Sequence, residues 1–306
     1  MNSQNSDHNS KISIGLPVYN GEYFLEKKLN SLLSQTFSDF ELIISDNAST
    51  DSTSGICKKF VEKDSRIRYY RQEQNMGANW NFNFVLQKAH SPYFLWAGVN
   101  DEVSKYFLEK NYKILETKLN VVGSISKIKP KDLSNISCNK STDHFFIKLI
   151  KNLRSLKSVG SYSIVGSYEN KTRFYLKNST CQLIYGMFRT NELKKSVVKE
   201  SFIGNDWATM LNILKFGDFY VVEDDIMYED IEGLSSTGII NMSNLYKHDY
   251  WGKIFPWHPF TFWYLKNFKR KIFVKNLDFF IQLNCEGVIS LLLDSFRLLI
   301  NKISKK

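Results

Sequence analysis

The sequence has few cysteines, and they form no recognisable metal or disulfide pattern. Cys57, Cys138, Cys181 and Cys285 are far apart, form no CxxC motif and have no histidine at metal-ligand spacing. Such spacing argues against both a zinc site and a disulfide framework. The four thiols are therefore expected to be reduced and mostly buried, as in a cytosolic protein.

Long apolar runs are also missing. No stretch of 18 uncharged apolar residues occurs, so the sequence predicts no transmembrane helix. Residues 1–10 are polar and lack the apolar core of a signal peptide, so we expect a disordered tail there. The signatures of DNA- and RNA-binding modules are absent as well, and we expect no nucleic-acid partner.

Charge of one sign gathers near the end of the chain. Of the formal net charge of +10, six units come from Lys266 onward. A basic surface attracts anionic lipid or phosphorylated ligands. Residues 238–306 are also rich in aromatic side chains, and we expect a helical extension there. Two interpretations stay open: peripheral contact with an anionic membrane, or helices that simply pack on the main domain.

The first hundred residues alternate between two hydrophobic patterns. Apolar runs predict strands, and intervening segments with helical spacing predict helices. This alternation indicates a parallel sheet with crossover helices. The strands are expected at 12–18, 40–45, 67–70 and 93–99, and the helices at 22–35, after residue 51, and at 80–89. Further along we expect a helix at 145–156, a strand or strand-turn at 182–189, a helix at 207–216 ended by Gly217, a strand at 219–222, and a helix at 272–303.

Polar side chains follow three of the predicted strands. The pairs are Tyr19-Asn20, Asp46-Asn47 and Asn100-Asp101. Because parallel strands end at one edge of their sheet, these pairs should share a ligand-binding crevice. A carboxylate at such an edge suits Mg²⁺ or Mn²⁺ holding a diphosphate. For the segment at Asp101 alone, an acidic turn after a buried strand is the alternative.

Several segments together resemble a known family. In order and spacing, they are similar to the motifs of family 2 glycosyltransferases. The resemblance covers about residues 11–237, and it rests on VYNG (18–21), SQTF (34–37), FELII (40–44), DNASTD (46–51), NMG (75–77), WAGVND (96–101), IYGMFR (184–189) and GNDW (204–207).

This resemblance implies a fold and an activity. The fold would be GT-A, a Rossmann-like α/β fold with a mostly parallel central sheet flanked by helices. The activity would be that of an inverting, metal-dependent, hexosyltransferase-like enzyme of polysaccharide and cell-envelope biosynthesis. It would move a sugar from a nucleotide-diphosphate donor to a glycan, lipid-linked or protein acceptor, in the cytoplasm or at the inner face of the membrane.

The resemblance also implies roles for single residues. Asp101 would bind Mg²⁺ or Mn²⁺, and Asn100 would contact ribose or sugar hydroxyls. The family usually has acids where Asn47 and Asn100 stand, which leaves the base of the donor open. The two asparagines also support an alternative, a catalytically weak sugar-nucleotide-binding or scaffold paralogue. The residues implied at the nucleotide and its sugar are Pro17, Tyr19, Asn20, Asp46, Asn47, Asn75, Gly77 and Asn100, with Arg71 either there or a solvated strand-end arginine.

An inverting transfer needs a general base for the acceptor hydroxyl, and a carboxylate suits this role. Asp206 is the candidate, since the resemblance aligns it with a downstream acidic motif. Its alternative is structural, as an aspartate that caps a helix. A second pool of carboxylates, usually a solvated loop, consists of Glu223, Asp224, Asp225, Glu229 and Asp230.

Overall fold

The computed structural model describes residues 10–130, 161–178, 181–229, 238–246 and 248–303. The helix expected at 145–156, Cys138 and all of the expected tail except Ser10 lie outside these ranges. Residues 230–237 lie outside them as well, so the domain boundary expected at residue 237 stays a prediction.

One eight-stranded sheet forms the centre of the molecule, in the order β3-β2-β1-β4-β7-β6-β8-β5. Neighbouring pairs among β1 to β4 are parallel, and so is the pair β6–β8, whereas β7 is antiparallel to both of its neighbours and β5 is antiparallel to β8. The predicted α/β fold with a mostly parallel sheet is confirmed. The strands are β1 (Ile12–Val18), β2 (Phe40–Asp46), β3 (Ile67–Arg71), β4 (Tyr93–Trp96), β5 (Glu102–Val103), β6 (Val121–Pro130), β7 (Met187–Arg189) and β8 (Asp218–Glu229).

The central strands are buried along their whole length. Every residue of β1, β2 and β4 is buried, which is why each reads as a continuous apolar run. The strand expected at 93–99 ends three residues early, at Trp96. The backbone N–H of Ala97 still donates to the carbonyl of Gly15 at 2.8 Å, after which the chain leaves the sheet. Residues 97–100 therefore form a loop at the carboxyl edge.

Four helices connect the strands of the first half. They are α1 (Glu22–Leu33), α2 (Thr53–Lys63), α3 (Ala78–Lys88) and α4 (Phe107–Thr117). In α1 the apolar positions Leu25, Leu29 and Leu32 are buried, as their spacing predicts. Ser52 is the N-cap of α2, and Asp51 before it accepts a hydrogen bond from the N–H of Thr53 at 3.0 Å. The predicted alternation of strands and helices is thus confirmed.

The second half departs more from expectation. The segment expected as a strand at 182–189 is a short 3₁₀ helix, η1 (Cys181–Tyr185), followed by β7. The helix expected at 207–216 is α8 (Asn205–Ile213), and Leu214, not Gly217, is its C-cap. The expected helix at 272–303 is interrupted at Asn276. The remaining helices are α6 (Tyr168–Lys177), α7 (Thr190–Ser196), α9 (Ile239–Leu245), α10 (Tyr250–Ile254), α11 (His258–Asn267), α12 (Arg270–Lys275) and α13 (Leu277–Ile303).

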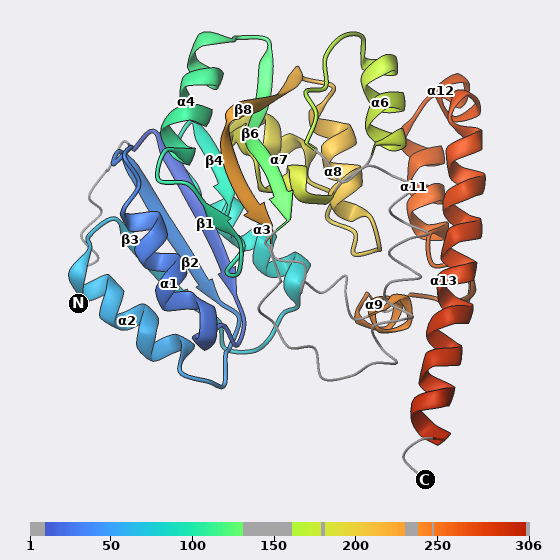
Figure 1. Ribbon diagram of the computed structural model, residues 1–306, viewed down its shortest axis with the longest axis horizontal. Helices are drawn as coiled ribbons and strands as arrows, with labels where there is room; N and C mark the ends of the chain where they lie inside the picture. The colour runs from blue at the N-terminus through green and yellow to red at the C-terminus, as the bar shows by residue number, and fades with distance from the viewer. Residues whose placement is uncertain (1–9, 131–160, 179–180, 230–237, 247, 304–306) are drawn as a thin grey trace.

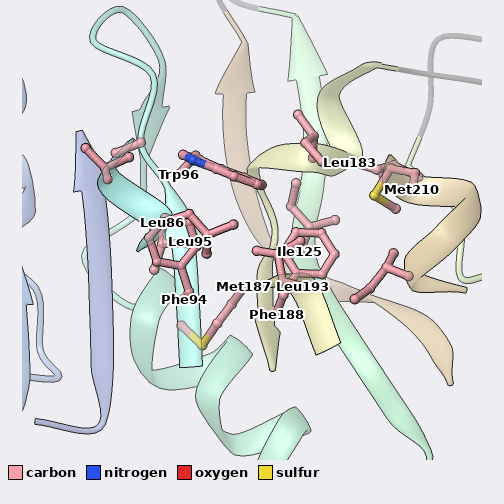
Figure 2. Close-up of a cluster of buried hydrophobic side chains, with 14 of the residues drawn as sticks. Leu86, Phe94, Leu95, Trp96, Ile125, Leu183, Met187, Phe188, Leu193 and Met210 are labelled. Atoms are coloured by element: carbon pink, nitrogen blue, oxygen red, sulfur yellow. The ribbon is translucent and has the colours of Figure 1, made fainter. Parts of the chain in front are cut away.

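The core continues from the parallel strands into the second half of the chain. Figure 2 shows Phe94 and Trp96 of β4 beside Met187 and Phe188 of β7, with Leu183 of η1 nearby. Figure 1 shows α6, α8, α11 and α13 gathered on the side of the sheet away from β3. Because β7 pairs with β4, the chain segment before α8 is fixed next to the strand that leads to Asp101.

The described residues bear on two predictions, one about membrane-spanning helices and one about the burial of the cysteine thiols. None of the helices in the described ranges is long and apolar enough to cross a membrane. The expectation of mostly buried thiols is only partly right. Cys57 is buried, but Cys181 is partly exposed and Cys285, on the outer side of α13, is exposed.

Candidate active site

The carboxyl edge of β2 is held together by a buried carboxylate. Asp46 is fully buried and accepts hydrogen bonds from the N–H of Ser49 at 2.8 Å and the hydroxyl of Tyr69 at 2.8 Å. Arg71 forms an ion pair with it at 2.7 Å and also donates to the carbonyl of Ser49 at 3.0 Å. Asp46 and Arg71, both predicted near the nucleotide, therefore fix the loop that follows β2.

Asn47 joins this loop to the loop before α3. Its side-chain nitrogen donates to Oδ1 of Asn75 at 2.9 Å and to the carbonyl of Gly77 at 3.3 Å. Its side-chain oxygen accepts from the N–H of Met76 at 2.9 Å. The structure thus brings together three predicted nucleotide residues, Asn47, Asn75 and Gly77. A carboxylate at position 47 lacks the donor that two of these contacts require.

This network predicts the effect of restoring an acid at position 47. In Asn47→Asp, a carboxylate would lie against the oxygens of Asn75 and Gly77, with two donated hydrogen bonds lost. We expect the free energy of unfolding to fall by about 1–3 kcal/mol at pH 7, measured by urea denaturation. The control Asn30→Asp, on the exposed face of α1, should change it by less than about 0.5 kcal/mol. Equal effects would show that Asn47 has no special role in the loop.

The end of β1 supplies an exposed aromatic ring. Pro17 is buried in the strand, whereas 49% of the Tyr19 side chain is exposed. Asn20 follows with a left-handed backbone (φ 49°), and its side-chain oxygen accepts from the N–H of Thr50 at 2.9 Å. A half-exposed ring beside the loop of Asn47 is a suitable surface for a nucleotide base to stack on.

Asp101 lines a small pocket at the carboxyl edge of β4. The pocket is bordered by Lys28, Trp96, Gly98, Asp101, Tyr185 and Met227. The Asp101 carboxylate lies so close to Gly98 that a Cβ there would sit 2.3 Å from Oδ2. Asp101 is 8% exposed, and Asn100 beside it is partly exposed. Asp101 thus lies on the wall of a pocket at this edge, and its role as a metal ligand stays a prediction.

A buried lysine accompanies this acid. Nζ of Lys28 donates to the backbone carbonyl of Asp101 at 2.9 Å. Burial lowers the pKa of Lys28 to about 8, against the opposing charges of Asp101 and Glu102. Lys28 thus positions the loop of Asp101, and Lys27 forms an ion pair with Glu102 on the outer side.

The carboxyl group of Asp206 lies in the first turn of α8. Gly204 is the N-cap of this helix, so the alternative role of Asp206 as the capping residue does not hold. Burial raises the pKa of Asp206 to about 6, although the N–H groups of Trp207 and Asp206 itself favour the charged form. A carboxyl group with a pKa near neutrality is suited to accept a proton from a substrate hydroxyl.

Two tyrosines surround Asp206. Burial, and then the charge of Asp206, raise the pKa of Tyr246 to about 12 and that of Tyr175 far above its usual value. The hydroxyl of Tyr175 is buried and has no hydrogen-bond partner. Both tyrosines are therefore close enough for the charge of Asp206 to act on their hydroxyls.

The second pool of carboxylates has other partners. Glu223 and Asp224 form exposed ion pairs with Lys127 and Lys110. Asp225 is buried and accepts hydrogen bonds from the hydroxyls of Ser104 and Ser126, both at 2.5 Å. Glu229 ends β8 and Asp230 lies outside the described residues. Asp206 is the stronger candidate for a base.

Two contacts join the site of Asp206 to the predicted nucleotide loops. The side chain of Asn205 donates to Oδ1 of Asn79 at 2.8 Å, and Asn79 follows directly on the loop of Gly77. The 3₁₀ helix η1 contacts α8, which bears Asp206, and its last residue, Tyr185, borders the pocket of Asp101. Asp101, Asp206 and the loops of Asn47 thus belong to one region.

Helices after residue 238 hold α8 in place. Trp257 stacks on Trp207, with ring centroids 5.0 Å apart. His248 is buried and accepts a hydrogen bond from the N–H of Ile203 at 3.4 Å through Nε2, while Nδ1 lies 3.2 Å from the carbonyl of Gly252. Burial lowers the pKa of His248, and its neutral form fits both contacts. The C-terminal extension is therefore part of the wall around Asp206.

Gly204 leaves no room for a side chain in this packing. Its φ is +92°, and a Cβ there would lie 2.9 Å from the ring of Trp257. We expect Gly204→Ala to lower the free energy of unfolding by about 2–3 kcal/mol, because strain and overpacking add. In the matched control Gly55→Ala, inside α2 with open space around it, we expect a gain of about 0.5–1 kcal/mol. Urea denaturation measures both, and a Gly204→Ala protein as stable as the wild type would contradict the packing argument.

Sequence reasoning missed Lys28, Asn79, Tyr175, Tyr246 and His248. None of them follows a predicted strand or stands in a recognisable motif. Lys28 carries the one weak signal, since it occupies the inner side of an amphipathic helix, where lysine is rarely buried without a partner.

Asp101 and its surroundings fit a metal site in which the substrate supplies some of the ligands. Among the described residues, no group of three or more His, Cys, Asp or Glu side chains would hold a metal without help. Mg²⁺ is commonly bound by one or two carboxylates together with substrate phosphates. Asp101 on the wall of its pocket suits a site of that kind, which the donor diphosphate would complete.

The sheet topology and the loops at its carboxyl edge define the class of protein. It is a GT-A-like fold, the α/β fold of nucleotide-sugar enzymes. Two solved structures share it: S. aureus TarS in complex with UDP-GlcNAc, with a TM-score of 0.55, 21% identity and coverage of 77% of this chain and 64% of that one, and mannosyltransferase PcManGT from Pyrobaculum calidifontis in complex with GDP-Man and Mn²⁺, with a TM-score of 0.58, 13% identity and coverage of 92% and 73%.

The family described as glycosyl transferase family 2 matches residues 13–190, more than half of the chain. The chain belongs to this family. Its relatives include the GalNAc(5)-diNAcBac-PP-undecaprenol beta-1,3-glucosyltransferase of Campylobacter jejuni, 25% identical over 214 residues, or 69% of this chain and 62% of that protein. The chain spans between 15% and 62% of the length of the first curated relatives that it matches.

Proposed function

We propose that this chain transfers a sugar, with inversion, from a nucleotide-diphosphate donor to an acceptor hydroxyl. The observation that carries this proposal is that η1 borders the pocket of Asp101 through Tyr185 and also contacts α8, the helix that bears Asp206. In the reaction, Asp206 takes the proton of the acceptor hydroxyl, and the oxygen of that hydroxyl attacks the anomeric carbon of the donor sugar. The bond from that carbon to the diphosphate breaks, and its electron pair leaves with the nucleoside diphosphate.

On the donor side, we assign the roles from the contacts of each residue. Asn47 and Asp46 shape the loops, because their polar atoms are already engaged there. Tyr19 offers the surface for the base, and Asn100 is placed to contact a sugar hydroxyl. Asp101 would hold Mg²⁺ or Mn²⁺, which when bound neutralises charge on the diphosphate. Structural neighbours bound to UDP-GlcNAc and GDP-Man support a nucleotide sugar as the donor.

On the acceptor side, we propose a glycan or lipid-linked acceptor, as in polysaccharide synthesis at the cytoplasmic face of a cell envelope. The name of the Campylobacter relative, which includes a polyprenyl diphosphate glycan, supports this choice. The acceptor hydroxyl would approach Asp206, because its proton must reach that carboxylate.

A donor screen tests the proposal. We expect one nucleotide sugar of a UDP, GDP, CDP and dTDP panel to raise the melting temperature when Mn²⁺ is present, and the same donor to be hydrolysed slowly without an acceptor. Asn100 favours a second candidate, a weakly catalytic sugar-nucleotide-binding or scaffold protein, because it removes one charge near the ion. Calorimetry separates the two: tight binding without metal and no turnover over a range of acceptors would support the second candidate and contradict the first.

A further inference from the structure

One face of α13 exposes a row of large apolar side chains. This helix has 27 residues, or about 40 Å of length. Phe279, Phe280 and Leu283 on its inner face are buried in the core. We call the row on the outer face the apolar stripe. The exposed fractions of its side chains lie between 42% and 64%, and its members are Leu277, Ile281, Ile289, Leu292, Phe296 and Leu299.

The stripe projects beyond the rest of the protein at its C-terminal end. The N–H of Ile239 at the start of α9 donates to Asp294, which is the last buried position described on α13. Beyond it, Leu298 and Leu299 are 48% and 55% exposed although they point to different sides of the helix. Figure 1 shows the C-terminal turns of α13 extending past α9.

Exposed basic side chains lie at both ends of the stripe. Lys302 is exposed at one end. The other end is next to α12, where Lys275 forms an ion pair with Glu169. The remaining basic residues there form what we call the basic cluster; all are exposed, and they are Lys266, Lys269, Arg270 and Lys271. Along α13 between these ends, Arg297 is the one described basic residue, and it pairs with Asp294 on the inner side.

We infer that the apolar stripe and the basic cluster together form a docking surface for an anionic lipid bilayer. Apolar side chains of such a helix enter the boundary between headgroups and acyl chains, while lysine and arginine attract anionic headgroups. The charge of the cluster is complementary to that surface. The helix would lie along the membrane, since no described helix is fit to span it. This inference goes beyond the proposed function and does not depend on turnover.

A second copy of the chain is the alternative occupant. The spacing of Cys285, Ile289, Leu292, Phe296 and Leu299 alternates between four and three residues, as in a two-stranded coiled coil. Such a seam is normally flanked by opposite charges that pair between the two helices. Here Val288, Leu293, Ser295 and Ile300 flank the middle of the seam, and charges stand only near its two ends, at Glu286 and Lys302, so the apolar surface is broad and its middle lacks those charges. Asp278, the acid at the α12 end of the stripe, pairs with Arg173, so the basic cluster dominates the charge at that end. The breadth of the apolar surface and this basic charge favour the bilayer.

Vesicle co-sedimentation of the whole chain tests the inference. We expect it to bind vesicles containing phosphatidylglycerol at 50 mM salt and to bind pure phosphatidylcholine at least about tenfold more weakly. Leu292→Glu with Phe296→Glu should reduce binding to the anionic vesicles about tenfold or more. Lys269→Glu with Arg270→Glu and Lys271→Glu should do the same. Deleting the segment is a poorer test, because Phe279 and Phe280 belong to the core.

Matched controls separate surface chemistry from loss of fold. Leu119→Glu places a charge at an exposed leucine far from α13 in sequence, and Lys58→Glu with Lys59→Glu reverses charge on α2. Both controls should bind vesicles like the wild type, and all variants should keep the melting temperature and donor hydrolysis. No wild-type binding at low salt, or equal loss in the controls, overturns the inference. A dimer in sedimentation velocity that Leu292→Glu with Phe296→Glu dissociates, without vesicle binding, would assign the stripe to a second copy.

Discussion

Replacing Asp206 by asparagine should lower kcat/KM for sugar transfer by about 10²–10⁴-fold while leaving donor affinity unchanged. The substitution keeps the shape of the side chain but removes its capacity to take a proton. Because Asp206 lies in the first turn of α8 and not at the N-cap, no helix cap is lost. Steady-state kinetics of sugar transfer measure the change in kcat/KM, and calorimetry with the donor measures its affinity.

The pH profile gives this prediction a second measurement. A base with a pKa of about 6 is active when deprotonated, so wild-type kcat/KM should fall about tenfold per pH unit below pH 6. The Asn variant should lack that limb. Since the folded state raises the pKa above the value in the unfolded chain, ionisation of Asp206 costs stability as pH rises from 4 to 7. We therefore expect Asp206→Asn to gain about 1–2 kcal/mol of stability at pH 7 but little at pH 4.

Asp224→Asn is the matched control for Asp206→Asn. Its carboxylate is exposed and pairs with Lys110, so activity should stay within about twofold of wild type. Full activity in Asp206→Asn would remove Asp206 as the base. The buried Asp225 would then be the next residue to test.

Replacing Asp101 by alanine should reduce transfer and donor hydrolysis by about 10³-fold, since an ion at the diphosphate supplies several kcal/mol of charge stabilisation. The loss should come with weaker binding of Mn²⁺ in the presence of the nucleoside diphosphate, followed by electron paramagnetic resonance. Binding of the unphosphorylated nucleoside should change little, because the loops of Asn47 and Tyr19 remain.

Glu102→Gln controls for charge at the same edge. Its side chain pairs with Lys27 on the outer side of β5, so we expect less than about a threefold effect on transfer. If the wild-type enzyme transfers sugar and Asp101→Ala transfers it equally well, Asp101 is not the metal ligand. If it lost activity with unchanged Mn²⁺ binding, the carboxylate would act on the loop and not on an ion.

The first half of the fold was predictable because local patterns match the final contacts. Strands β1, β2 and β4 are buried on both faces and therefore read as apolar runs, and their shared direction fixed where polar residues would gather. The position of Asn47 at the sheet edge followed from that topology, whereas Asn75 and Gly77 were indicated by the family resemblance. The sequence did not indicate how these residues meet. Asn47 donates hydrogen bonds through its side-chain nitrogen, and this arrangement depends on the shape of the two loops.

The second half was less predictable because its contacts are distant in sequence. β7 has three residues and pairs with β4, and although the expected strand or strand-turn at 182–189 included it, most of that segment is the 3₁₀ helix η1. Asn205 meets Asn79 across 126 positions, and no local pattern indicates such a pair. The cluster around Asp206 also depends on Tyr246 and Trp257, whose aromatic rings read equally well as ordinary core.

The hydrogen bond between Asn79 and Asn205 also has a consequence for the order in which the protein forms. The loops of Asn47 and Asn75 need only the first hundred residues, which emerge early from the ribosome. The helix of Asp206 reaches its final support only when Trp257 has been synthesised and has stacked on Trp207. During synthesis, the residues of these loops are therefore made well before the residues that support the helix of Asp206.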